Sequence, residues 1–249
     1  MADDSVYSKG LIYDTSLPTA SDNDEWKGAR QTRYNERFNQ PIGDWRYARA
    51  REQTLFVAHN ATNDEATTLA GHVAPVLADA DATMTKPFIF LRVPAGASKY
   101  VELDYIELEC VVIGASGTED NWADQLDTGT TRLSSGGTSL TIVNPNMQST
   151  AASMLATGTL LGGAVVSGAE SASVRHLGHG QMSDTIMVAG DRYLFTYGHT
   201  PSLGTVDRHV ITRPPVILGA TDQYLLALYA PSQAATAAVY KVRMQWSER

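Results

Sequence analysis

The sequence predicts an all-β fold: an antiparallel β-sandwich of the jelly-roll type with an extended N-terminal arm. After position 54, short β-prone segments separated by turn residues recur about every 10 to 15 residues, which is typical of a sandwich. No long segment with a helical period interrupts them. Their number, roughly eight, suits a jelly roll. We therefore expect an arm over residues 1–53 and a sandwich body over residues 54–249.

The arm differs from the body in its charge. Of the 249 residues, positions 1–53 hold 17 charged side chains and positions 54–249 hold 29, so the arm is about twice as charged per residue. Within the arm, residues 26–51 carry seven basic side chains, two acidic ones and five aromatic ones. Pro18 and Pro41 interrupt the arm, and we expect it to have little core of its own.

Arginine and aromatic side chains in one segment are the composition that anchors protein interfaces. The same composition fits a channel for single-stranded nucleic acid, and a solvated tail is the third alternative. A net charge of −8 argues against a dedicated nucleic-acid-binding protein. We interpret the arm as a capsid or subunit interface. The residues expected to make its contacts are Trp26, Arg30, Arg33, Tyr34, Arg37, Phe38, Trp45, Arg46 and Tyr47.

The first strands of the body are predicted over Thr54–Ala58, Phe88–Val93 and Tyr100–Ile113. In the third of these the apolar alternation slips by one residue, so we expect a β-bulge near Tyr105–Ile106. The slip places Cys110 on the inward row, where a thiol behaves as a small hydrophobic side chain. The acidic residues of this strand are expected on its exterior, with a sign opposite to that of the arm: Glu102, Asp104, Glu107 and Glu109.

Two segments in the middle of the chain differ from the rest. Residues 119–127 are expected to form one or two helical turns. Residues 128–173 are rich in small residues and contain only two charged side chains, Arg132 and Glu170. This stretch is too long and too uncharged for a free linker. We expect an insertion of loops and short strands, packed either within the body or against a neighbouring subunit.

The last third of the chain returns to strands, with a turn at Gly219–Asp222. In the final strand Tyr240, Val242, Met244 and Trp246 share one face, which we expect to be buried. The strands expected before it are Ser173–Leu177, Asp184–Val188, Arg192–Tyr197, His209–Thr212, Val216–Leu218 and Gln223–Ala230.

No catalytic or metal-binding motif stands out. The sequence lacks the nucleophile elbow, the phosphate-binding loop and the H-E-x-x-H zinc motif. His176 and His179 come nearest to a metal pair, but residues three apart in an extended segment point to opposite faces. A single cysteine excludes a disulfide framework and a cysteine-based zinc site. We therefore expect no enzymatic activity, no metal and no cofactor.

The sequence also bears on location. It contains no run of about 18 apolar residues that would cross a membrane. The first ten residues have neither the basic nor the apolar region of a signal peptide, so we expect synthesis in a reducing host cytoplasm.

Residues 51–62, REQTLFVAHNAT, resemble a segment that follows a polar N-terminal arm in a loosely defined family of virion structural proteins from tailed bacteriophages. Three later segments are also similar: Lys99–Leu108, Gly137–Asn144, and the end of the chain from Pro214–Leu218 to Trp246–Arg249. Ile142 departs from the family pattern, which often has proline there. The positions that match in the first segment are Arg51, Glu52, Phe56, Val57, Ala58, Asn60 and Thr62.

The resemblance implies a non-enzymatic, head-associated protein: a jelly-roll cement or decoration protein that stabilises the outer capsid. Its partners would be the lattice of the major capsid protein and further copies of itself, as a homotrimer on the capsid surface of the virion. The arm would then reach across neighbouring capsid subunits. The alternative is a receptor- or glycan-binding module of a phage tail or fibre, because jelly rolls also serve as lectins.

Overall fold

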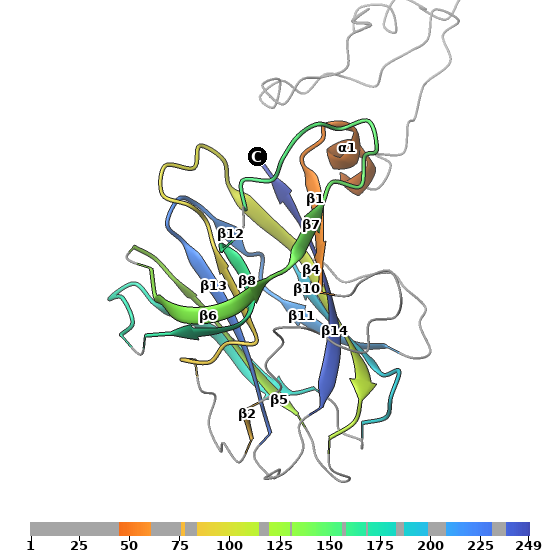
Figure 1. The fold of residues 1–249 in the computed structure, drawn as a ribbon, viewed down its shortest axis with the longest axis vertical. Helices are drawn as coiled ribbons and strands as arrows, with labels where there is room; N and C mark the ends of the chain where they lie inside the picture. Colours follow the sequence, from red (N-terminus) through yellow and green to blue (C-terminus); the bar gives the residue numbers. More distant parts are fainter. Residues whose placement is uncertain are drawn as a thin grey trace, which may run out of the picture. The chain divides into compact units, whose positions relative to one another are not determined.

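The computed structural model describes residues 45–60, 76–77, 84–114, 120–129, 131–155, 158–167, 169–182, 187–198, 208–230 and 238–249. These residues form one short helix and fourteen strands, which confirms the prediction of an all-β fold (Figure 1). The chain divides after Ala48 into two units, and all fourteen strands belong to the unit from Arg49 to Arg249.

The strands form two seven-stranded sheets that pack face to face as a sandwich, as the sequence predicts. In spatial order the first sheet contains β11 (Arg208–Arg213), β10 (Arg192–Tyr197), β4 (Val101–Val112), β14 (Val239–Glu248), β1 (Leu55–His59) and β7 (Thr141–Val143), with β12 (Ile217–Leu218) beside β4. The second sheet contains β6 (Leu133–Ser139), β8 (Leu160–Val166), β3 (Ile89–Arg92), β13 (Gln223–Ala230), β5 (Asn121–Asp127) and β9 (Arg175–Gln181), with β2 (Val76–Leu77) beside β13. The helix α1 (Trp45–Arg51) precedes β1. Two strand pairs, β10–β11 and β2–β13, are parallel, whereas the sequence predicts antiparallel pairing.

The core lies between the two sheets and is built from alternating side chains. The four residues predicted for the inner face of the last strand are each at most 2% exposed, which confirms that prediction. Trp122 of the second sheet meets Phe195 of the first edge to face, with 5.4 Å between ring centroids. Every residue of β13 is buried, so both faces of that central strand are covered and its sequence reads as a continuous apolar run.

The predicted bulge in β4 is present, but it lies one position earlier. β14 pairs Trp246 with Leu103 and Gln245 with Tyr105, so Asp104 is the extra residue. Cys110 is 1% exposed, as predicted. The prediction of an acidic exterior is wrong for Asp104 and Glu107, which are 1% and 7% exposed. Asp104 bonds the side-chain amide of Gln245 on β14, and Glu107 lies between β10 and β14.

The prediction of helical turns over residues 119–127 is wrong. Residues 121–127 form β5, which pairs with β13 on one side and β9 on the other. The polar composition of β5 is typical of an exposed helix, but its polar side chains are buried against residues from distant segments. Of the predicted strand Asp184–Val188, Met187 and Val188 lie outside any strand, and the remainder falls outside the described residues. The described part of residues 128–173 contains β6, β7 and β8.

One side of the sandwich is closed by the chain itself. β6 in the second sheet runs through Leu140 directly into β7 in the first sheet, and Figure 1 shows the two as one sweeping ribbon. Gly137 makes this path possible. Its φ is +84°, and a Cβ there would lie 3.1 Å from Leu161 Cβ and 3.2 Å from Ala164 Cα.

This packing predicts that alanine substitutions at the adjacent Gly136 and Gly137 destabilise the fold by different amounts. Gly136 also has a positive φ, of +68°, but a Cβ there would meet nothing within 4 Å. Gly136→Ala should lower the free energy of unfolding by about 1 to 2 kcal/mol through backbone strain alone. Gly137→Ala should cost about 1 to 3 kcal/mol more, because it also overpacks β8. Urea denaturation of both variants measures the difference, and equal losses would contradict the close contact.

Candidate functional site

The residues predicted to form an interface divide into two groups. Trp26, Arg30, Arg33, Tyr34, Arg37 and Phe38 lie outside the described residues, so their role stays a prediction. Trp45, Arg46 and Tyr47 form the first turn of α1, where Arg46 is half-buried.

The helix α1 ends in a junction that is fixed to the sandwich. Thr54 N–H donates to Arg49 O (3.0 Å), and Gln53 takes a left-handed φ of 62°, which turns the chain out of the helix. The side-chain amides of Asn144 and Asn146 donate to Gln53 O and Ala50 O, each at 3.1 Å. The end of α1 and the residues that follow it are therefore held by the loop after β7.

A buried carboxylate holds the far part of the same loop. Glu248 is 1% exposed and accepts hydrogen bonds from Met154 N–H (3.0 Å), from the indole N–H of Trp246 (3.1 Å) and from the hydroxyl of Ser153. Charge-assisted hydrogen bonds of this kind compensate for the burial of a carboxylate. Through these contacts Glu248 fixes Ser153 and Met154 to the end of β14.

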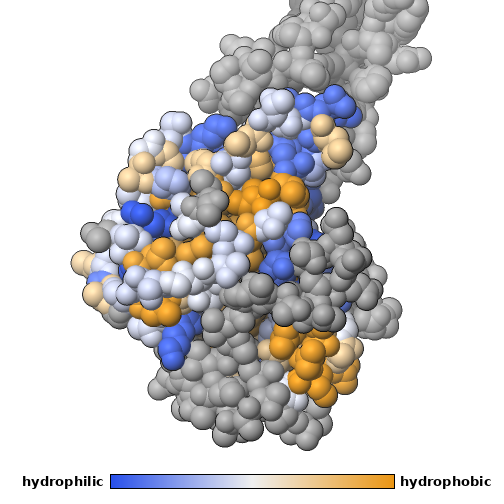
Figure 2. All heavy atoms as spheres, viewed as in Figure 1, coloured by the Kyte–Doolittle hydropathy of each residue, from blue (hydrophilic) through white to orange (hydrophobic). Residues whose placement is uncertain are grey.

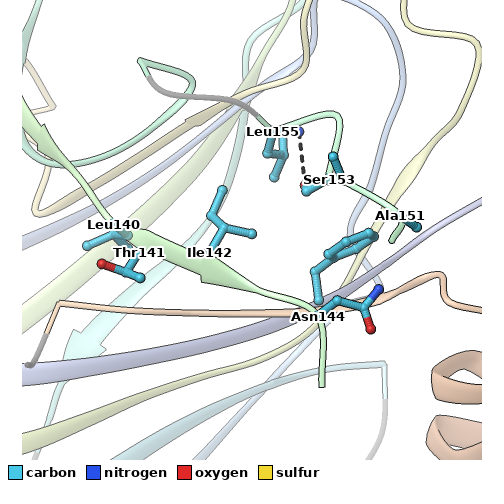
Figure 3. A pocket seen from close by; sticks show the side chains of 9 residues that line it. Leu140, Thr141, Ile142, Asn144, Ala151, Ser153 and Leu155 are labelled. Carbon is cyan, nitrogen blue, oxygen red and sulfur yellow. Dashed lines mark hydrogen bonds between the residues drawn. The ribbon is translucent and has the colours of Figure 1, made fainter. Parts of the chain in front are cut away.

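Between this loop and β7 lies a groove of about 400 Å³ (Figure 3). Its floor includes Phe56, which stacks on Trp246 with 6.0 Å between ring centroids. Figure 2 shows apolar surface at the centre of the face on which β7 is drawn in Figure 1. The residues that line the groove are Phe56, Leu140, Thr141, Ile142, Asn144, Ala151, Ala152, Ser153 and Leu155.

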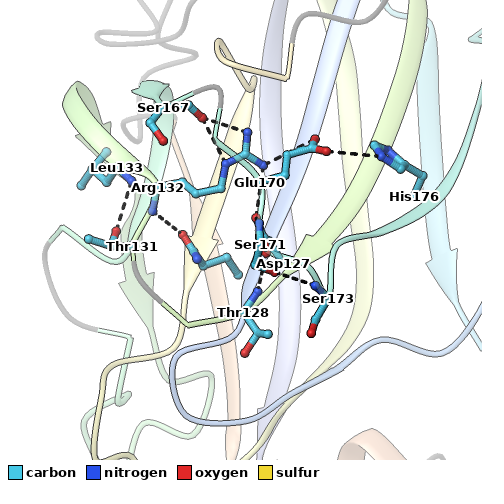
Figure 4. A network of polar contacts seen from close by, with 11 residues as sticks. Asp127, Thr128, Thr131, Arg132, Leu133, Ser167, Glu170, Ser171, Ser173 and His176 are labelled. Atoms are coloured by element: carbon cyan, nitrogen blue, oxygen red, sulfur yellow. Dashed lines mark hydrogen bonds and ion pairs between the residues drawn. The ribbon is translucent and has the colours of Figure 1, made fainter.

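A second group of buried polar side chains lies on the outer face of the second sheet (Figure 4). Trp122 points into the core, so alternation along β5 directs Gln125 and Asp127 outward. Arg132, 4% exposed, donates from Nε and Nη2 to Ser167 O (3.1 and 2.9 Å) and from Nη1 to Asp127 Oδ2 (3.4 Å). Its backbone N–H donates to Gln223 Oε1 (2.9 Å).

Glu170 extends this network towards the surface. In the amide orientation that its neighbours require, Gln125 donates to Glu170 Oε1 (3.2 Å) and accepts from Arg132. Glu170 Oε2 lies 3.8 Å from Nε2 of the exposed His176. These contacts fasten the segment between β8 and β9 onto the sheet.

Asp127 is the charged centre of the network. Its burial alone would raise the pKa of the carboxyl group. Hydrogen bonds from the Ser171 hydroxyl and from the N–H groups of Thr128 and Ser171, with the nearby Arg132 charge, outweigh burial and lower the pKa below 3.8. The folded state therefore favours the ionised carboxylate.

A third polar contact bridges the two sheets on the side opposite β6 and β7. Arg213, at the end of β11, donates from Nε and Nη2 to the two oxygens of Asp124 on β5, at 3.0 and 2.7 Å. The guanidinium lies over the ring of Trp122, 4.5 Å from its centroid. Burial raises the pKa of Asp124, and the charge of Arg213 offsets part of that rise. Beside the pair, the hydroxyls of Tyr197 and Tyr224 lie 2.5 Å apart.

The sequence analysis also considered Cys110 as a nucleophile and His176 with His179 as a metal pair. Burial raises the pKa of Cys110 to about 12, which leaves its thiol protonated at neutral pH. A bulge at Leu177 places His176 and His179 on the same face of β9, contrary to the prediction, because Gly178 and His176 oppose the consecutive residues Asp124 and Gln125. Both imidazoles are exposed.

No group of three or more metal-ligating side chains occurs in the part of the chain that the structure describes. Within those same ranges, no helix is long and apolar enough to cross a membrane. The described body offers a groove beside β7 and several buried polar contacts that hold its elements together.

Removing one partner of the Arg213–Asp124 pair is predicted to lower the free energy of unfolding strongly. Arg213→Met leaves the Asp124 carboxylate buried without its cation and should lower the free energy of unfolding by about 3 to 5 kcal/mol near neutral pH. The loss should shrink as the pH falls, because the orphaned Asp124 then takes up a proton. Adding Asp124→Asn to Arg213→Met should recover much of the loss. Urea denaturation at several pH values measures this, and a pH-independent loss without recovery would contradict the role of the pair.

Replacing Asp127 is also predicted to cost less stability as the pH falls, but for a different reason. Its pKa is lowered in the folded state, so its contribution is present above the unfolded value near 3.8 and disappears as the pH falls below it. Asp127→Asn should cost about 1 to 3 kcal/mol at neutral pH and much less below the unfolded pKa. Glu52, 42% exposed and 3.2 Å from Arg49, is the matched control, and Glu52→Gln should change stability by less than about 0.5 kcal/mol. If the free energies of unfolding of wild type and Asp127→Asn differed by the same amount at neutral and at acid pH, the lowered pKa of Asp127 would be refuted.

Comparison with known proteins assigns no relative to this chain: no family model, no curated protein and no solved structure matches it.

Proposed function

We propose that this chain is a non-enzymatic structural protein of a tailed-bacteriophage virion, which binds and stabilises the outer capsid as a cement or decoration protein. The observation that carries the proposal is the order of the strands within the two sheets. The order of eight of them supports a jelly roll, an architecture used by viral capsid proteins.

The strand order supports a jelly roll as follows. The eight strands, in chain order, are β1, β3, β4, β5, β9, β10, β13 and β14. The first, third, sixth and eighth lie together as β1–β14–β4–β10, and the others lie together as β3–β13–β5–β9. This interleaving is that of two Greek keys wound into one sandwich. β6, β7 and β8 then belong to an insertion between the fourth and fifth strands, where the small-residue segment 128–173 is found.

The use of buried acidic groups supports a structural rather than a catalytic body. Asp104 accepts from Gln245 Nε2 at 2.5 Å, and Asp120 accepts from the hydroxyl of Tyr240. Asp124 is paired with Arg213, and Asp127 with Arg132. These carboxylates, like Glu248, are engaged in hydrogen bonds or ion pairs within the fold.

The arm supports binding to a lattice. It is basic and aromatic over residues 26–51, and it joins the body at a junction held by Asn144 and Asn146. A rigid root with an interface-type arm suits a protein that sits on one surface and contacts neighbouring subunits. Individually weak contacts repeated around a shell act together through effective concentration.

The proposal predicts that the arm arginines are required for capsid binding. Arg30→Glu, Arg33→Glu and Arg37→Glu in one chain should lower occupancy on capsids at least tenfold, because like charges at an interface repel. The control reverses three exposed body charges, by Lys86→Glu, Lys99→Glu and Arg175→Glu, and should bind as wild type does. Co-sedimentation with capsids from the lysate that produces the chain, with copies counted by mass spectrometry, measures occupancy.

Deletion of residues 1–44 tests the same arm without changing the sandwich, since Ala50 and Gln53 keep their bonds to the loop. The truncated body should melt at nearly the same temperature and no longer decorate capsids. Wild-type occupancy by either the truncated or the triple variant would contradict a role for the arm. If the intact chain stays in the soluble fractions, the capsid proposal fails, and a glycan array becomes the test of the lectin alternative.

A further inference from the structure

We infer that a small hollow at the end of β5 binds one ring of a neutral carbohydrate. The hollow has a volume of about 170 Å³ and lies where β5 and β9 of the second sheet meet β12 of the first. This inference goes beyond capsid binding and does not depend on it. The residues that line the hollow are Leu126, Asp127, Thr128, Ser173, Arg175, Ile217, Leu218 and Asp222.

The hollow contains polar groups that the described fold leaves without a partner. The guanidinium of the exposed Arg175 makes no hydrogen bond or ion pair with any residue that the structure describes. Asp222 Oδ2 accepts from Gly219 N–H (2.8 Å), whereas Oδ1 receives no hydrogen bond within the described ranges. The same holds for the hydroxyls of Thr128 and Ser173, which Figure 4 shows side by side. The hollow therefore offers free donors and free acceptors together.

The charges around the hollow favour a neutral ligand. Asp127 and Asp222 place two carboxylates in the lining, and Arg175 places one guanidinium there. Asp127 is itself paired with Arg132. An anion would face both carboxylates, and a bare cation would face Arg175, so each would meet a like charge. A sugar hydroxyl both donates and accepts, so a polyol can bind Arg175 and Asp222 at once without bringing a net charge.

Apolar surface beside these polar groups suits the C–H face of a sugar ring. Ile217, which lines the hollow, is 57% exposed. Tyr100 is 58% exposed, and a Cβ on Gly219 would lie 3.3 Å from the Tyr100 ring and 3.5 Å from Asp222 Oδ2. The aromatic ring and the carboxylate therefore flank the same glycine. A ligand held by Asp222 would have an apolar face within reach of both Tyr100 and Ile217.

The turn that carries Asp222 has a strained backbone. Asp222 N–H donates to Gly219 O (3.0 Å), which closes a four-residue turn. The third residue of the turn, Thr221, has a φ of 71°, a left-handed value that glycine or asparagine usually supplies at this position. A β-branched residue is rarely found there, and strain of this kind gathers at ligand-binding positions. The turn fixes Asp222 before a ligand arrives, so binding requires little further ordering.

The size of the hollow sets the size of the ligand. Pockets for drug-sized molecules have volumes of about 300 to 1,000 Å³. The smaller volume here, about 170 Å³, suits a single sugar ring. One ring makes few contacts, so we expect a free monosaccharide to bind with a Kd on the order of 1 mM.

Saturation-transfer NMR of the full chain tests the inference with six neutral sugars: glucose, galactose, mannose, rhamnose, N-acetylglucosamine and N-acetylgalactosamine. At least one should bind saturably. Arg175→Met should weaken its binding at least tenfold. Asp222→Asn should weaken it at least fivefold, because asparagine keeps the bond to Gly219 but loses the charge that strengthens a hydrogen bond to the sugar. The matched control, Arg243→Met, removes an exposed arginine from β14 of the first sheet and should bind as wild type does.

The outcomes separate the alternatives. The inference is overturned if none of the six sugars binds, or if Arg175→Met and Asp222→Asn, with melting temperatures close to that of wild type, bind the sugar as tightly as wild type. It is also overturned if free glycine or inorganic phosphate displaces the sugar at equal concentration, since the site would then take a charged ligand.

The capsid experiments test a different part of the chain. A chain without residues 1–44 should keep its sugar binding, and Arg175→Met should keep its capsid occupancy. Loss of capsid binding by the intact chain with intact sugar binding would reject the proposed function and leave this site in place.

Discussion

The ion pair formed by Arg213 and Asp124 fixes the two sheets to each other at one side of the shared core. The pair joins the edge of the first sheet to the second, and the guanidinium also covers the ring of Trp122. Gly178 leaves room for it, since a Cβ at that position would lie 2.8 Å from Arg213 Nη2. Without the cation, the buried Asp124 carboxylate would be uncompensated beside the core. On the other side, the chain itself links the two sheets, because β6 of the second sheet continues through Leu140 into β7 of the first. The groove lies beside β7, so its shape depends on this link.

The other buried polar groups follow the same logic at the surface. Glu248 holds the loop after β7, and Arg132 with Asp127 holds the segment before β9. The loop after β7 also buries Leu155 in the core, but the segment before β9 is poor in apolar residues that could anchor it by burial alone. Charge-assisted hydrogen bonds replace hydrophobic contacts there and give loops a defined position. Surfaces fixed in this way lose little conformational entropy when a partner binds.

The proposed functions draw on two separate features of one chain. The arm offers basic and aromatic side chains, and the body offers a small hollow at the end of β5. In the proposed function, the ionisable groups of the body position its loops, and capsid recognition depends on the charge and aromatic side chains of residues 26–51.

The sequence by itself determined the features that depend on local pattern. The strict alternation of β14, the apolar run of β13 and the bounds of β10 are all readable from residue order, because inward and outward faces alternate along a strand. Composition likewise distinguishes the highly charged residues 1–53 from the rest and shows that residues 128–173 are rich in small residues. The inward position of Cys110 follows from the same alternation once a bulge is allowed.

Tertiary structure alone decided the rest, because the partners are distant in sequence. The polar β5 is a strand since Asp124 meets Arg213, 89 residues away, and Asp120 meets Tyr240, 120 residues away. The exact place of the bulge depends on which residue of β14 faces Asp104. The groove is assembled from three separate segments around Phe56, Ile142 and Leu155. A local sequence period cannot predict these contacts, because the packing of one sheet on the other brings the segments together.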